Sequence, residues 1–170
     1  MKFRKVSAQD IIKTDHLFYH CLTDLLTREK ITEEGLLEHE VDRLQKAVQE
    51  SLANQDKPFF IAEQDEEIIG TIALYPPGPM ITSALPTVTG SYEVACVYVH
   101  PEYQRQGVGK FLFQNIIQEL RLRGHTAFFL DAGFSSSQKY WEDVLGEPSC
   151  VVENYWGLGK HHLVWKRELQ

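Results

Sequence analysis

The chain has 170 residues, which suits one domain of ordinary size, and 43% of them are hydrophobic. Its net charge of −7 argues against a broad nucleic-acid-binding surface. The three cysteines, Cys21, Cys96 and Cys150, are scattered and form no CxxC pair, so neither a disulfide scaffold nor a zinc site is indicated. The N-terminus is charged and no apolar run approaches the ~20 residues that span a bilayer. We therefore expect a single domain over residues 1–170, cytoplasmic, without metal, nucleic acid or membrane partners.

Hydrophobic periodicity predicts an alternation of strands and helices along the whole chain. In chain order we expect a strand at 3–6, helices at about 11–27 and 32–52, strands at 59–63, 68–74 and 92–99, a helix at 108–123, a strand at 126–130, a helix at 135–144, and strands at 149–155 and 161–168. The acidic turn 64–67 joins two of these strands as a hairpin. The Pro-, Ser- and Thr-rich stretch from Pro76 to Gly90 is predicted to be a long loop. The pattern indicates a mixed α/β fold.

The junction between the strand at 92–99 and the following helix carries the clearest functional signal, Gln104-Arg105-Gln106-Gly107-Val108-Gly109-Lys110. Glycine lets a backbone approach a ligand closely, and the first turn of a helix offers unpaired N–H groups to an anion. Two familiar phosphate loops do not fit. Gln104 and Phe111 replace the first Gly and the Ser or Thr of a P-loop, and Leu112 replaces the third Gly of a dinucleotide fingerprint.

The pattern that fits is Q-x-x-G-x-G, preceded by Val97-Tyr98-Val99-His100-Pro101, an acidic residue and an aromatic one. This run resembles the acyl-CoA-binding motif of the GNAT acetyltransferase superfamily. The resemblance extends over nearly the whole chain and implies the GNAT fold, in which helices flank a central mixed, mostly antiparallel sheet. It also implies an N-acetyltransferase that moves an acetyl group from acetyl-CoA to a primary amine by direct attack.

The resemblance assigns cofactor contacts to residues on both sides of His100. The strand in GNAT proteins is splayed by a β-bulge, and its exposed backbone pairs with the pantetheine arm. The matching positions are Val97, Tyr98 and Val99, and the Val97 N–H is a candidate donor to the thioester carbonyl. The pyrophosphate would be wrapped by the loop, which comprises Gln104, Arg105, Gln106, Gly107, Val108, Gly109 and Lys110. For the Arg105 and Lys110 side chains, simple solvent exposure is the alternative.

Glu93 is the candidate general base that takes the proton of the attacking amine. It is the only carboxylate inside an otherwise apolar strand, and burial would raise its pKa toward a useful value. Its spacing to Gln104 matches the catalytic glutamate of the histone-acetyltransferase branch. Strict alternation would place Glu93, Ala95 and Val97 on one face and Cys96 on the other. A solvent-facing or ion-paired carboxylate is the alternative.

Tyr140 is the candidate general acid, because the superfamily often places a tyrosine on the helix after the next strand. Leu145-Gly146 follows it with one residue more than the usual pattern. The alternative is that Tyr140 and Trp141 only anchor this helix to the sheet, and Tyr155 is a second candidate. Tyr155, Trp156 and Trp165 are most simply core residues of the terminal strands.

The acceptor is not named by the sequence beyond a small-molecule or peptide amine, and a homodimer is compatible with it. His16 and His20 have helical metal-ligand spacing but no third ligand, so a polar helix face is favoured. Two other functions stay open. The chain could be a non-catalytic acyl-CoA sensor on the same fold, or a partner-binding module that uses the first two helices and binds no cofactor.

Overall fold

The computed structural model describes residues 1–87 and 89–169. The backbone divides into two compact units, one formed by Met1–Leu74 with Cys96–Gln118 and the other by Tyr75–Ala95 with Glu119–Gln170. One strand, β4 (Glu93–Val99), crosses between them, because the chain leaves the second unit after Ala95. The single-domain organisation stays a prediction.

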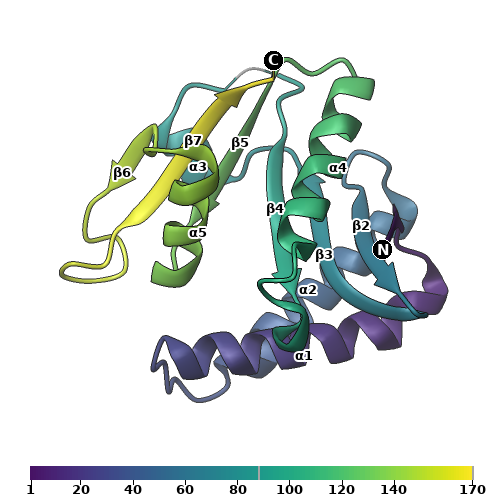
Figure 1. Cartoon of the computed structure of the whole chain (residues 1–170). Coiled ribbons are helices and arrows are strands. Elements are labelled where there is room, and N and C mark those ends of the chain that lie inside the picture. Colours follow the sequence, from purple (N-terminus) through teal and green to yellow (C-terminus); the bar gives the residue numbers. More distant parts are fainter. Residues whose placement is uncertain (88, 170) are drawn as a thin grey trace. The chain divides into compact units, whose positions relative to one another are not determined.

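The first unit pairs antiparallel strands with two long helices (Figure 1). Its strands follow the order β1-β2-β3-β4, and β1–β2 and β2–β3 are antiparallel. Its elements are β1 (Lys2–Lys5), α1 (Ile11–Arg28), α2 (Leu36–Ala53), β2 (Phe59–Gln64), most of β3 (Glu67–Tyr75), the second half of β4 and most of α4 (Val108–Leu122).

The helices of this unit bury the apolar stripe that the sequence predicts. Leu17, Phe18 and Leu22 of α1 and Leu44 and Val48 of α2 are at most 2% exposed. Helix α2 begins at Leu36 rather than near Thr32. The reason is Gly35, whose φ of 77° breaks the helical backbone immediately before it.

The predicted hairpin between β2 and β3 is confirmed. Asp65 and Glu66 form its tip with φ values of 51° and 64°. Two successive residues with positive φ give the turn the twist that two-residue hairpins favour.

The second unit packs two helices on strands in the order β4-β5-β7-β6. Its further elements are α3 (Pro79–Ala84), β5 (Ala127–Ala132), α5 (Ser135–Leu145), β6 (Cys150–Val152) and β7 (His162–Glu168). Strand β4 pairs with β5 in parallel, and β7 pairs antiparallel with both β5 and β6. Ile81 of α3, Phe129 of β5 and Val164 of β7 form one buried cluster.

The expectation of a mixed α/β fold with mostly antiparallel strand pairs is confirmed. Three local predictions are wrong. The stretch after Pro76 contains helix α3 rather than only a loop. Strand β6 is limited to Cys150–Val152. Trp165 is fully buried as predicted, but Tyr155 and Trp156 are 53% and 57% exposed, because they lie in the loop after β6.

Within the described residues, no helix is long and apolar enough to cross a membrane.

Candidate active site

The glycine-rich loop lies between β4 and α4 in the first unit (Figure 1). A 3-10 turn at Pro101–Tyr103 precedes it, and α4 begins at Val108. Arg105 and Gly107 have φ values of 59° and 86°. Left-handed residues in a turn can direct neighbouring N–H groups toward a common side, as in anion-binding nests.

The N–H groups of this loop are available to a ligand. Among residues 1–87 and 89–169, no acceptor is found for the backbone N–H groups of residues 105–110, whereas the Phe111 N–H bonds to the Gly107 carbonyl and starts the helical ladder. Three of these N–H groups, those of residues 108–110, lie in the first turn of α4, and unpaired N–H groups at the start of a helix can bind an anion. Arg105 and Lys110 are exposed beside them.

Two glutamine side chains hold the loop in this shape. Gln104 Nε2 donates to the Val99 carbonyl at 3.3 Å, and Gln106 Nε2 donates to the Glu102 carbonyl at 2.6 Å. The side chain of Gln104 therefore ties the loop back to the end of β4. The glutamine of the Q-x-x-G-x-G pattern thus has a structural role, independent of any direct contact with a ligand.

Gly70 of β3 lies beneath the start of α4 and was missed by the sequence analysis. A Cβ atom at this position would lie 2.9 Å from the Tyr98 carbonyl oxygen, 2.9 Å from Leu112 Cδ1 and 3.2 Å from Val108 Cγ1. The absence of a side chain at Gly70 lets the helix approach the strands closely. An isolated glycine within a strand is the sequence signal that could have found it.

Strand β4 changes direction at Cys96, whose φ is 52°. Thr71 Oγ1 donates to the Cys96 carbonyl at 2.9 Å and holds this irregular residue. The positive φ of Cys96 therefore interrupts the regular backbone of β4. The irregularity falls immediately before Val97, where the sequence predicts a bulge.

The three cofactor candidates of β4 lie in the first unit after this irregular residue. Val97 and Val99 are half-buried. The ring of Tyr98 packs edge-on against Phe18 at 5.8 Å between centroids. Tyr98 therefore contributes its backbone to this segment and its side chain to the core.

Glu93 begins β4 in the second unit and is partly buried. Its Oε2 atom accepts a 2.8 Å hydrogen bond from the backbone N–H of Gly78, the residue that caps α3. Burial raises the pKa of Glu93 to about 7, the Gly78 bond opposes that rise, and the nearby negative charge of Asp131 adds to it. A carboxyl group with a pKa near neutrality can accept and release a proton under ordinary conditions.

Tyr140 lies on α5, in the same unit, and its side chain is 37% exposed. Its ring contacts that of Trp141 at 4.8 Å between centroids, and burial raises the pKa of its hydroxyl. Trp141 is 4% exposed and anchors the helix. Trp141 therefore packs the helix against the core, whereas Tyr140 stays partly exposed.

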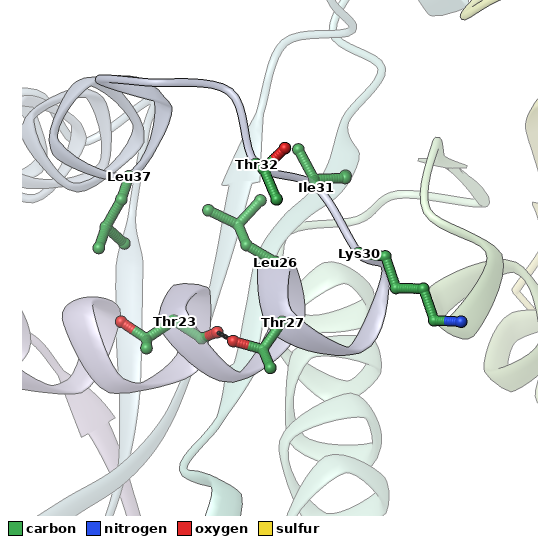
Figure 2. A pocket seen from close by; sticks show the side chains of 7 residues that line it. All are labelled: Thr23, Leu26, Thr27, Lys30, Ile31, Thr32 and Leu37. Atoms are coloured by element: carbon green, nitrogen blue, oxygen red, sulfur yellow. Dashed lines mark hydrogen bonds between the residues drawn. The ribbon is translucent and has the colours of Figure 1, made fainter.

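A pocket of about 470 Å³ lies at the turn between α1 and α2 (Figure 2). Its walls include Leu26 of α1, Leu37 of α2, and Lys30 in the turn between them. Ile31 and the threonines Thr23, Thr27 and Thr32 line the rest of the pocket. The Thr27 hydroxyl donates to the Thr23 carbonyl. The pocket contains none of the predicted site residues and no group suited to acyl transfer.

Among residues 1–87 and 89–169, no group of three or more His, Cys, Asp or Glu side chains is arranged to hold a metal ion. His16 is exposed, and the ring of His20 lies 5.4 Å from that of His100 rather than in a ligand set with it.

The sequence model of the Acetyltransferase (GNAT) family matches residues 20–146 of this chain. The chain belongs to the GNAT acetyltransferase family. The match includes the whole loop and both candidate catalytic residues, Glu93 and Tyr140.

Two solved structures show the GNAT fold over essentially the whole chain. One is described as a putative acetyltransferase of the GNAT family from Desulfovibrio desulfuricans, with a TM-score of 0.77, 20% identity and 99% coverage of both chains. The other is the PaiA N-acetyltransferase from Thermoplasma acidophilum in complex with coenzyme A, with a TM-score of 0.71, 18% identity and 98% coverage of both chains.

An amino-acid acetyltransferase from Shewanella oneidensis is 34% identical over 80 residues, which is 47% of this chain. The matched segment is only 16% of that relative's length. This GNAT chain therefore corresponds to a small part of the curated relative that it matches.

Proposed function

We propose that this protein is an N-acetyltransferase that uses acetyl-CoA and a primary amine. The observation that carries the proposal is the row of N–H groups from Arg105 to Lys110, before and within the first turn of α4, for which the described part of the chain supplies no acceptor. Such a row matches the multiple oxygens of a pyrophosphate, which coenzyme A carries. In this proposal residues 1–170 form a single catalytic domain.

In this proposal the backbone of Val97, Tyr98 and Val99 binds the pantetheine arm, and the loop from Gln104 to Lys110 binds the pyrophosphate. The irregular backbone at Cys96 supports the first part, because a strand that departs from regular pairing leaves N–H and C=O groups for an extended ligand. The Val97 N–H is the proposed donor to the thioester oxygen in the transition state.

The reaction would be a direct transfer. The neutral amine nitrogen attacks the thioester carbonyl carbon, forming a C–N bond and a tetrahedral intermediate. Glu93 accepts the proton that the amine loses, and its pKa of about 7 suits that task. The C–S bond then breaks, and the departing thiolate takes a proton from Tyr140. The products are an amide and free coenzyme A.

The test is amine-dependent release of the coenzyme A thiol from acetyl-CoA, measured with a thiol reagent across a panel of primary amines. The proposal expects thiol release that requires both an amine and Glu93, with the Glu93→Gln variant as the matched control. Binding of acetyl-CoA without amine-dependent release would instead support the acyl-CoA sensor. The absence of binding would reject both and favour a partner-binding module.

A further inference from the structure

A second carboxylate lies on the same face of the strands as Glu93. Glu93 pairs with Phe129 across β4 and β5, and Asp131 follows two residues later on β5. Side chains two residues apart on a strand share a face, so Glu93, Phe129 and Asp131 point the same way, with Asp131 about 7 Å farther along the strand. The same charge that raises the pKa of Glu93 thus belongs to a neighbour on its own face.

His162 approaches Asp131 from β7. Its Nε2 atom lies 3.1 Å from Asp131 Oδ2, and its side chain is 9% exposed against 34% for Asp131. The Nε2 atom is buried and makes no aligned hydrogen bond within the described residues. The contact with Asp131 is therefore close but off-line, and a small rotation of the carboxylate would complete it.

The hydrogen bond from Trp156 determines which ring nitrogen of His162 carries the proton. Its indole Nε1 donates to His162 Nδ1 at 3.0 Å. Because an indole nitrogen can only donate, Nδ1 must be the unprotonated nitrogen, and the ring is the neutral tautomer with its proton on Nε2. Gly133 makes room for this bond, since a Cβ there would lie 2.9 Å from the indole nitrogen and 3.1 Å from Nδ1.

A neutral His162 leaves the charge of Asp131 uncompensated. Across residues 1–87 and 89–169, no lysine or arginine lies within 4.0 Å of its carboxylate, and its ion-pair contact is with His162 alone. The Asp131 carboxylate is partly exposed, so a cationic group of a ligand can reach it and form a charge-assisted hydrogen bond. The exposed rings of Tyr155 and Trp156, 4.8 Å apart and both next to His162, add faces that attract cations.

We propose that Asp131, held by His162 and Trp156, binds a second ammonium group of the acceptor, so that the preferred acceptors are amines with two positive charges. The reacting amine lies at Glu93 and the second ammonium at Asp131, on one face of the β4–β5 pair. This inference rests on the proposed acetyl transfer and names its substrate class. In this arrangement Asp131 is a binding residue, and His162 and Trp156 are positioning residues.

The experiment compares 1,4-diaminobutane with butylamine, which differ by one amino group, as acceptors in the thiol-release assay. The wild type is expected to show a kcat/KM for the diamine roughly 10- to 100-fold above that for the monoamine, the range of a charge-assisted hydrogen bond. Asp131→Asn should raise the KM for the diamine to that for the monoamine, whereas the loss of its effect on the pKa of Glu93 should change the rates with both amines by the same factor. Asp143→Asn removes an exposed charge on α5 and is the matched control, expected to change neither acceptor.

Trp156→Phe tests the positioning role, because it keeps an aromatic ring and removes the N–H that holds His162 neutral. It should raise the KM for the diamine without lowering kcat, and thermal unfolding checks that the fold persists. Equal use of the two amines by the wild type, or an equal loss on both amines in Asp131→Asn, would overturn the inference. Failure of acetyl-CoA to bind would instead contradict the proposed function, so the two failures are distinguishable.

Discussion

The side chain of Glu93 and the backbone N–H of Gly78 are joined by a 2.8 Å hydrogen bond. Gly78 is the residue immediately before α3, so the proline-rich segment fixes the carboxylate at the start of β4. The bond favours the ionised carboxylate, yet burial outweighs it and keeps the pKa near 7. Glu93 is thus both oriented by the fold and poised to exchange a proton.

The first prediction follows from the ionisation of Glu93. Because its carboxylate is the active form, kcat/KM should rise with pH through an inflection near pH 7. Glu93→Gln keeps an acceptor for the Gly78 N–H but cannot take a proton, so it should lower kcat/KM by about 10²–10⁴-fold at neutral pH. The ratio of wild-type to variant rates cancels the titration of the amine itself. A ratio that does not change between pH 6 and pH 9 would contradict a role for Glu93 as base.

The second prediction concerns Tyr140. Tyr140→Phe removes only the hydroxyl, so it should lower kcat by about 10²-fold while leaving the acetyl-CoA affinity and the thermal unfolding temperature unchanged. Tyr155→Phe is the matched control, because Tyr155 is the other exposed tyrosine considered as the acid. If Tyr155→Phe lowers kcat and Tyr140→Phe does not, the two assignments must be exchanged.

The third prediction concerns Gly70 beneath the glycine-rich loop. Gly70→Ala would place a methyl group 2.9 Å from a backbone oxygen that cannot move freely. We expect a loss of about 1–3 kcal/mol in the free energy of unfolding and weaker binding of acetyl-CoA. Gly78→Ala is the control, since a Cβ there meets its nearest neighbour at an ordinary 3.6 Å and its φ of −74° suits alanine. Denaturant unfolding of the two variants would contradict the account if both were equally stable.

The fourth prediction concerns the connection between β1 and α1. Asp10 is 4% exposed, accepts two hydrogen bonds from Arg4 at 2.7 and 2.9 Å, and accepts two more from Ser7. These bonds hold the pKa of Asp10 well below its usual range, with the Arg4 bond as the main cause. A carboxylate whose pKa is lower in the folded than in the unfolded state stabilises the folded state at pH values above the unfolded pKa of 3.8. That stability is lost as the pH falls below 3.8 toward the folded pKa.

Asp10→Asn should therefore lower the free energy of unfolding at pH 7 by about 1–3 kcal/mol and reduce its dependence on pH in the acid range. Asp24→Asn, which breaks an exposed pair with Arg28 on α1, should cost about 0.5 kcal/mol or less. The reading fails if acid unfolding of Asp10→Asn follows the wild-type curve.

The sequence alone was sufficient where the structural cause is local. Gly107 and Gly109 next to Gln104 mark the loop, and the apolar stripe of α1 marks its buried face. The turn at Asp65 and Glu66 was also predictable from its position between two apolar runs. In each case the residues that determine the structure are neighbours in the chain.

Prediction failed where a local signal is ambiguous or distant residues meet. The prolines and Gly78 indicate a loop, yet Pro79 also suits the first position of a helix, so α3 was missed. The resemblance predicts a bulge in β4, but it does not show that Cys96 has the positive φ or that Thr71 of another strand donates to its carbonyl. The contact between Asp131 and His162 depends on the register of β5 with β7, and no motif encodes that register.

The most direct test of the central claim is isothermal titration of acetyl-CoA into the wild type, Gly107→Glu and Gly124→Glu. Gly107 and Gly124 have similar φ values of 86° and 80°, and a Cβ at either would meet nothing within 4 Å, so the backbone strain of the two substitutions is matched. Only the first places a carboxylate in the row of unpaired N–H groups. The account predicts that the wild type and Gly124→Glu bind acetyl-CoA and that Gly107→Glu does not. Absence of binding by the wild type, or equal binding by all three proteins, would contradict it.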